Sequence, residues 1–89
     1  MNPFEMAMVI AQKEDCPCSY LDSVSVVERF KGKVAWDGIV FVFGLYRPPK
    51  QLCYGWVDPD AQTLVTVLNR PPVDSPETAV RAYIASRGK

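Results

Sequence analysis

Cys16-Pro17-Cys18 is the local motif with the clearest capacity for chemistry, because two thiols one residue apart can chelate a soft metal ion or form an exchangeable disulfide. Cys53 would be the third ligand of such a site, and Asp15 or Asp22 the fourth, since structural zinc sites usually have four ligands. We expect Cys53 to point away from the helix-covered face of the sheet, where it does not meet the motif. The sequence therefore predicts no metal and no cofactor, and the odd number of cysteines favours reduced thiols.

The chain contains no histidine, which excludes several catalytic arrangements. A Ser-His-Asp triad, a Cys-His dyad or a histidine-ligated metal site cannot be built from this chain alone. Asp58-Pro59-Asp60-Ala61-Gln62 has acidic residues at alternate positions, as a calcium loop does, but it lacks the glycine and the distal glutamate of such a loop and is interpreted as a turn. No carboxylate pair is spaced for acid–base work and no glycine-rich phosphate loop is present, so nothing indicates an enzyme.

The composition is typical of a single globular domain over residues 1–89, with 48% hydrophobic residues and equal numbers of basic and acidic side chains. Zero formal net charge provides no overall attraction to nucleic acid or to an anionic membrane. The longest nearly apolar stretches, residues 6–11 and 39–46, are far shorter than the ~20 residues of a membrane span. No basic residue precedes Lys13, so the beginning lacks the basic region of a secretory signal and we expect a cytoplasmic protein.

Capping residues predict a helix near each end of the chain. Asn2, Pro3 and Glu5 suit the N-cap, the first position and the first turn of a helix that ends near Lys13. Ser75, Pro76 and Glu77 likewise suit the N-cap, the first position and the first turn of a helix. They predict a second helix toward the C-terminus, with Arg87 and Lys89 near its negative end.

Residues 24–36 alternate apolar and polar side chains, which is the period of a strand. Asp37-Gly38 then suits a type I′ turn, because both central positions of that turn need positive φ. With this turn, Trp36 faces Ile39, and the next three pairs along the ladder are also apolar or glycine. A turn at Lys31-Gly32-Lys33 and a helix over residues 22–31 are the competing interpretations.

Two further strands are predicted at residues 51–57 and 63–68, joined by a turn at residues 58–62 and paired so that Val57 faces Thr63. The sequence thus predicts an α+β fold. It is a four-stranded antiparallel β-meander in the order α-β-β-β-β-α, with the N- and C-terminal helices packed on one face. We assign the helices to the face that holds most of the aromatic residues.

The opposite face would then be open and rich in valine. Because a contiguous apolar patch on a small protein commonly marks a binding surface, we predict a non-enzymatic protein-interaction module. It would form a homodimer or dock on another protein as a subunit or adaptor. The alternative is a half-exposed sheet surface whose β-branched residues serve strand formation alone. The predicted partner-binding residues are Val40, Val42, Cys53, Val57, Val65 and Val67.

A second functional hypothesis is weak nucleic-acid binding at a basic end of the sheet, where cations would contact phosphates and a ring would stack on a base. The simpler interpretation is that edge-strand lysines prevent aggregation and that loop charges are solvated. The α-β-β-β-α part of the order is similar to the double-stranded-RNA-binding domain, but that family needs basic residues at the start of its last helix. This chain has Asp74-Ser75-Pro76-Glu77 there, so we assign no family. The residues of this hypothesis are Arg29, Lys31, Tyr46, Arg47, Lys50 and Arg70.

Overall fold

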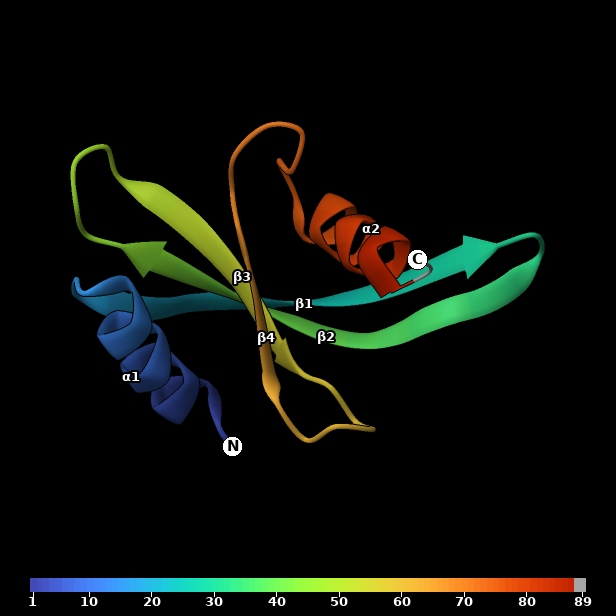
Figure 1. Ribbon diagram of the computed structural model, residues 1–89, viewed down its shortest axis with the longest axis horizontal. Coiled ribbons are helices and arrows are strands. Elements are labelled where there is room, and N and C mark those ends of the chain that lie inside the picture. Colours follow the sequence, from blue (N-terminus) through green and yellow to red (C-terminus); the bar gives the residue numbers. More distant parts are fainter. Residues whose placement is uncertain (88–89) are drawn as a thin grey trace.

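The computed structural model describes residues 1–87 of the chain. The strands form one antiparallel sheet in the order β1-β2-β3-β4. The predicted α+β fold and its element order are therefore confirmed, while the expected place of Lys89 near the helix end lies outside the described residues. The elements, shown in Figure 1, are α1 (Pro3–Glu14), β1 (Cys18–Phe30), β2 (Lys33–Leu45), β3 (Gln51–Val57), β4 (Leu64–Leu68) and α2 (Pro76–Arg87).

Both helices begin where the capping residues predict. The Asn2 side chain accepts a hydrogen bond from the Glu5 backbone N–H at 2.9 Å, and the Glu5 carboxylate accepts one from the Asn2 N–H at 3.1 Å. At α2, the Ser75 hydroxyl accepts a hydrogen bond from the Thr78 N–H at 3.1 Å. These contacts satisfy N–H groups that have no partner inside the first helical turn.

The turn between β1 and β2 lies at Lys31 and Gly32 rather than at Asp37-Gly38. Both turn residues have positive φ, 52° and 77°, as a tight two-residue hairpin turn requires. Asp37 and Gly38 lie inside β2, opposite Val27 and Val26. The prediction of a turn at Asp37-Gly38 is wrong, as is the helix over residues 22–31, and the competing turn is right. With it, residues 18–23 also join β1, and a 13-residue strand makes a longer hydrogen-bonded ladder.

The register of β3 and β4 differs from the expected one by a single residue. Val57 pairs with Leu64 rather than with Thr63. Thr63 instead closes the turn, where its carbonyl accepts a hydrogen bond from the Asp58 N–H at 2.8 Å. Because side chains alternate between the two faces, the shift places Leu64 on the face covered by α1 and Val65 on the face covered by α2.

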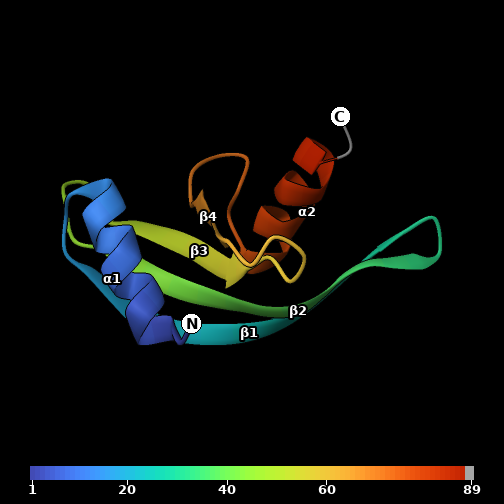
Figure 2. The same ribbon diagram turned by 60° about the horizontal axis from the view of Figure 1, so that its bottom comes forward.

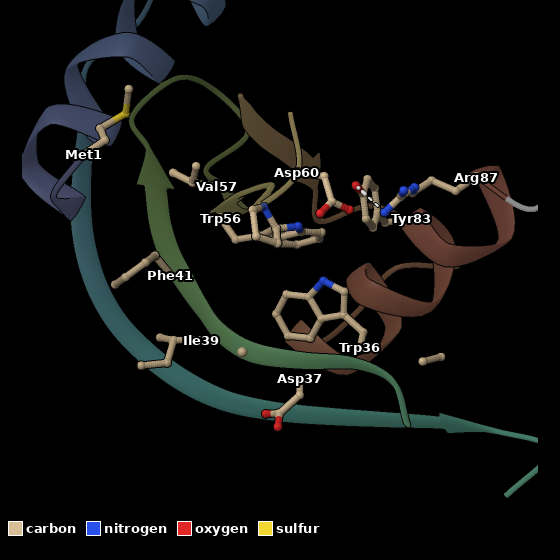
Figure 3. Close-up of a pocket in the computed structure, with 13 residues that line it drawn as sticks. Met1, Trp36, Asp37, Ile39, Phe41, Trp56, Val57, Asp60, Tyr83 and Arg87 are labelled. Atoms are coloured by element: carbon tan, nitrogen blue, oxygen red, sulfur yellow. Dashed lines mark hydrogen bonds between the residues drawn. The ribbon is translucent and has the colours of Figure 1, made fainter. Parts of the chain in front are cut away.

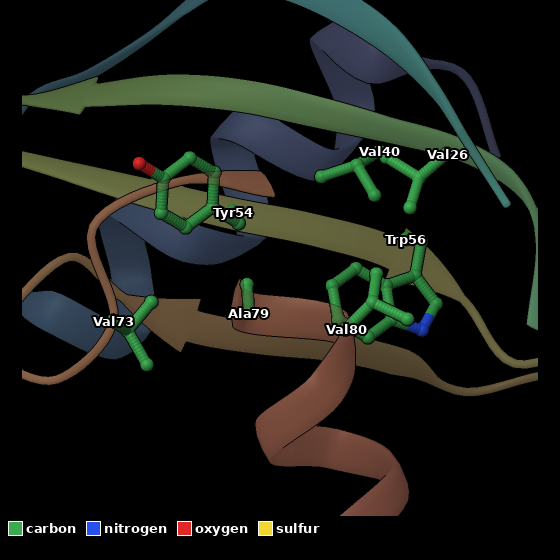
Figure 4. Packing of buried hydrophobic residues seen from close by; sticks show 7 residues of the cluster. All are labelled: Val26, Val40, Tyr54, Trp56, Val73, Ala79 and Val80. Carbon is green, nitrogen blue, oxygen red and sulfur yellow. The ribbon is translucent and has the colours of Figure 1, made fainter. Parts of the chain in front are cut away.

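The two helices pack on opposite faces of the sheet. α1 covers a buried cluster that includes Phe43 and Leu45, and α2 covers one that includes Val40 and Trp56. Figure 4 shows α2 in front of the strands and α1 behind them, and Figure 2 shows the same arrangement from another side. The prediction that both helices share one face is wrong. Both faces carry apolar side chains at alternate positions, so each needs a cover.

β1 and β2 extend beyond the other strands as a two-stranded ribbon (Figures 1 and 2). β3 pairs with β2 only at residues 41–45, although β2 begins at Lys33. One side of β2 therefore has no partner strand over residues 33–40 in the part of the chain that the structure describes. We call this segment the open edge of β2.

Candidate functional site

The backbone of the open edge presents hydrogen-bonding groups away from β1. The Tyr46 N–H donates to the Pro17 carbonyl at 3.0 Å, so the even-numbered residues of β2 from Trp36 onward direct their backbone groups toward β1. Alternation along the strand directs the N–H and C=O groups of Asp37 and Ile39 to the other side, where β3 no longer pairs. Asp37 and Ile39 thus offer a short unpaired ladder to an incoming strand.

A cleft of about 560 Å³ lies beside this edge (Figure 3). One wall is the open edge of β2 with Ile39, and a second is the β3–β4 turn with Asp60. The third wall is the C-terminal half of α2, which contributes Tyr83 and Arg87. The cleft exists because β3 pairs with β2 only up to Gly55 and then continues with β4 alone.

Three aromatic rings pack together along the cleft. Trp56 meets Trp36 edge-on, with 5.5 Å between ring centroids, and meets Tyr83 edge-on at 5.4 Å. Trp56 is only 2% exposed, and its buried Nε1–H has no hydrogen-bond partner among residues 1–87. A buried donor without an acceptor costs roughly 1–3 kcal/mol, so such a group calls for an explanation. An acceptor brought into the cleft is one explanation.

Asp58 ties the β3–β4 turn to α2. Its carboxylate accepts hydrogen bonds from the Tyr83 hydroxyl at 2.5 Å and from the N–H groups of Asp60 and Ala61 at 2.8 and 3.2 Å. Arg87 lies 4.0 Å from the same carboxylate. The hydrogen bond from Tyr83, followed by the two backbone hydrogen bonds, lowers the pKa of Asp58, and the same contact raises the pKa of Tyr83. The turn that forms one wall of the cleft is therefore held in place.

The rim of the cleft is acidic because Arg87, the basic side chain that lines it among the described residues, is already engaged. Arg87 faces the Asp58 carboxylate and also lies 5.5 Å from the centre of the Tyr83 ring. Asp37 and Asp60 are exposed and form no ion pair within the described residues. A phosphate would meet repulsion here, whereas a basic side chain would be attracted.

We expect the Asp58–Tyr83 hydrogen bond to stabilise the fold between about pH 4 and pH 10. The pKa of Asp58 is depressed on folding, so its contribution is present above the unfolded value of about 3.9 and is lost as the pH falls. The pKa of Tyr83 is raised, so its contribution is present below about 10 and is lost as the pH rises. Tyr83→Phe should lower the Tm at neutral pH and flatten its pH dependence at both ends in thermal circular dichroism. Parallel pH profiles for the two proteins would contradict this expectation.

The six residues expected to form one partner-binding face are divided between two covered faces. Val40, Val42, Val65 and Val67 belong to the cluster under α2, and Val40 is fully buried. Cys53 and Val57 belong to the cluster under α1. No open valine face exists among the described residues, because α1 and α2 cover opposite faces of the sheet. Whether any of these residues contacts a partner stays a prediction.

The residues of the nucleic-acid hypothesis fall into two groups at opposite ends of the β1–β2 hairpin. Arg29 and Lys31 lie at the hairpin tip, whereas Tyr46, Arg47 and Lys50 lie beyond the other end of β2, and Arg70 follows β4. Arg47 forms an ion pair with Glu14 at 3.0 Å, and Lys50 Nζ lies 5.1 Å from the centre of the Tyr46 ring. The six residues therefore do not form one continuous basic track.

The three cysteines lie in one cluster on the α1 side of the sheet. Cys53 is 1% exposed and packs in the cluster that Cys16 and Cys18 border, so the expectation that it points away from a helix-covered face is wrong. All three are free thiols. Within residues 1–87, no group of three or more cysteine, aspartate or glutamate side chains is placed to hold a metal ion.

We expect the thiols of Cys53 and Cys18 to be poor nucleophiles. Burial, followed by repulsion from Cys18, raises the pKa of Cys53 to about 12, and burial followed by repulsion from Cys16 raises that of Cys18 to about 11. At pH 8 the thiolate fractions are then ~10⁻⁴ and ~10⁻³. Ellman's reagent should modify Cys53 at least ~100-fold more slowly in the native protein than in urea. Equal rates would show that Cys53 is not enclosed.

Sequence reasoning misses the cleft because it places Asp37 in a turn. The cleft depends on a difference in strand length, 13 residues in β2 against 7 in β3, and on the point at which β3 diverges. Both are properties of the assembled sheet. The local signal that could have helped is Lys31-Gly32, a turn dipeptide placed so that Asp37 falls in mid-strand.

Comparison of the chain with protein-family models, with curated proteins and with solved structures finds no match. Neither helix within residues 1–87 has the length and apolar character that crossing a membrane requires. The fold and the cleft define an α+β domain in which one side of β2 has no partner strand over residues 33–40 and borders the cleft.

Proposed function

We propose that this protein is a non-enzymatic protein-interaction module that binds an extended polypeptide segment along the open edge of β2. The observation that supports the proposal is the unpaired backbone at Asp37 and Ile39 beside a preformed cleft. Adding a strand to an exposed sheet edge is a recurrent mode of peptide recognition, in which backbone hydrogen bonds provide affinity. Native proteins usually protect such edges from other chains, so an accessible edge is a candidate binding site for another strand.

The walls of the cleft suit a segment with apolar and basic side chains. Ile39 is 50% exposed and Met1 is 65% exposed, and both line the cleft beside Phe41. Alternate residues of an added strand would contact these apolar groups, since side chains of neighbouring strands meet on the same face. Asp37 and Asp60 would attract a lysine or arginine of the same segment.

The same charges make nucleic acid a poor ligand for this cleft. Phosphates would approach the carboxylates of Asp37 and Asp60, and no unengaged basic side chain lines the cleft within the described residues. These charges favour a polypeptide ligand over nucleic acid, and a polypeptide is the only ligand that we propose.

Proline substitution provides a direct test, because Ile39 and Ser25 form a cross-strand pair whose N–H groups point to opposite edges of the ribbon. Ile39→Pro removes the N–H that faces the cleft, whereas Ser25→Pro removes one that faces the outer edge of β1. Proline is tolerated where the lost N–H does not serve the ladder. Each variant should retain the circular dichroism spectrum of the parent protein.

In quantitative cross-linking from native lysate, Ile39→Pro should capture bound protein at least ~10-fold less than the parent, since one backbone hydrogen bond and the fit of the strand are lost. Ser25→Pro should capture the same proteins as the parent. If the two variants lose the same partners equally, or neither loses any, the open edge of β2 is not the binding site.

A further inference from the structure

We propose that the segment bound at the open edge of β2 is the same edge of a second copy of this chain. This inference rests on the proposed function and names the partner at the same site. Two β2 strands would pair in antiparallel fashion about a two-fold axis and join two four-stranded sheets into one. Such an interface uses the same surface on both copies and closes on itself, so it gives a dimer rather than a fibre.

Charge complementarity along the edge favours this partner. The hairpin tip carries three exposed cations, Arg29, Lys31 and Lys33, while the cleft end carries Asp37 and Asp60. The acidic residue nearest the tip, Glu28, is already paired with Arg81 at 2.7 Å. An antiparallel arrangement lays the basic tip of one copy beside the acidic cleft of the other, and does so twice.

The apolar residues of the ribbon follow the same pattern. Phe30 is 65% exposed, and Val34 and Ile39 are each 50% exposed, although all three belong to the β1–β2 hairpin. A two-fold axis near Trp36 would place the hairpin tip of one copy beside Asp37 and Ile39 of the other. Ala35 is an extra residue of β2, so Val34, which pairs with Arg29, lies on the same face as Asp37 and Ile39. Val34 and Ile39 of each copy would then lie near the other copy.

The outer edge of β1 is a less suitable surface for self-association. Leu21 is an extra residue of β1 between Tyr20 and Asp22, and it interrupts the middle of that edge. The extra residue of β2, Ala35, lies on the tip side of Asp37 and Ile39 and leaves their ladder regular. Bulges and charges are the usual devices that keep an edge from pairing. The open edge of β2 instead runs beside a cleft that leaves room for another strand.

The test is the molar mass of the purified full chain as a function of concentration, measured by sedimentation equilibrium. The parent should pass from 10.0 kDa to twice that mass. Lys33→Asp and Asp37→Lys should each weaken dimerisation at least ~10-fold, because each weakens, at two places per dimer, the attraction between the basic tip of one copy and the acidic cleft end of the other. The double variant K33D/D37K restores complementarity and should return to within ~3-fold of the parent. Lys50→Asp, at the far end of the hairpin, should leave the dimer unchanged.

A monomer at every concentration would overturn this inference. The proposed function would still hold if Ile39→Pro failed to capture, from lysate, a protein other than this chain that the parent captures. If Ile39→Pro captured the same proteins as the parent, both the proposed function and the dimer would fail. A dimer that persists in Ile39→Pro, or single charge variants that the double variant does not rescue, would also overturn the β2–β2 pairing. Rescue by the double variant identifies the partner surface, since a general loss of folding would not be reversed by a second charge change.

Discussion

Replacing Phe43 by alanine should reduce the free energy of unfolding by about 3–5 kcal/mol, the usual cost of removing a fully buried ring. Phe43 is 0% exposed under α1, and its ring lies against Gly55, where even a single Cβ would come within 3.1 Å of it. It also packs against Tyr20, with 6.1 Å between ring centroids. The side chains around Phe43 are therefore too tightly packed to move into the cavity that alanine would leave. Urea denaturation monitored by circular dichroism measures the change.

A loss of this size is a large fraction of the total free energy of unfolding. A domain of 89 residues has a stability of roughly 4–13 kcal/mol, so the variant would be partly unfolded at the lower end of that range. Phe30→Ala is the matched control, because Phe30 is 65% exposed at the hairpin tip, and it should cost under about 1 kcal/mol. Equal losses at the two positions would show that the face under α1 is not a core.

Trp56→Ala should also cost about 3–5 kcal/mol, on the opposite face of the sheet. The Trp56 ring is 2% exposed and holds Trp36 and Tyr83 together through its two edge-on contacts. Its removal would loosen the wall of the cleft as well as the core under α2. Thermal and urea unfolding measure the stability. In the same protein, dimerisation should weaken.

Trp56→Phe separates packing from hydrogen bonding at this position. The smaller ring retains part of the contact area, and the substitution removes the Nε1–H that is buried without a partner. Because an unsatisfied buried donor is itself destabilising, we expect less than about half the loss seen for alanine. A loss as large as that of Trp56→Ala would mean that this N–H has an acceptor in the folded protein.

The elements predicted well are those with local causes. Asn2 and Glu5 cap α1 through hydrogen bonds to each other's backbone, so three residues of sequence are enough to locate the start of the helix. Alternation in residues 51–57 likewise identified β3 within its actual bounds. The order of elements followed, because short connections favour neighbouring antiparallel strands.

The registers had long-range causes and were predicted incorrectly. Lys31-Gly32 and Asp37-Gly38 both suit a tight turn, and the turn at Asp37-Gly38 would pair apolar residues with apolar residues. The actual hairpin instead pairs Phe30 with Lys33 and Val27 with Asp37. The choice depends on residues 18–23, whose pairing with β2 is possible only with the earlier turn. The predicted valine-rich binding face depended on these registers and was therefore misplaced. The open surface is an edge of β2, whose existence depends on where β3 stops pairing, and not a face of the sheet.

The most direct test of the open edge is amide hydrogen exchange at residues 37–40, resolved by NMR in dilute and in concentrated solution. In the dilute monomer, the Asp37 and Ile39 amides should exchange at least ~10-fold faster than those of Gly38 and Val40, which face β1. Concentration should slow exchange at Asp37 and Ile39 selectively, as the second copy supplies carbonyl acceptors. Protection of Asp37 and Ile39 in the dilute monomer would contradict an open edge, and fast exchange of both in a dimer would contradict pairing through it.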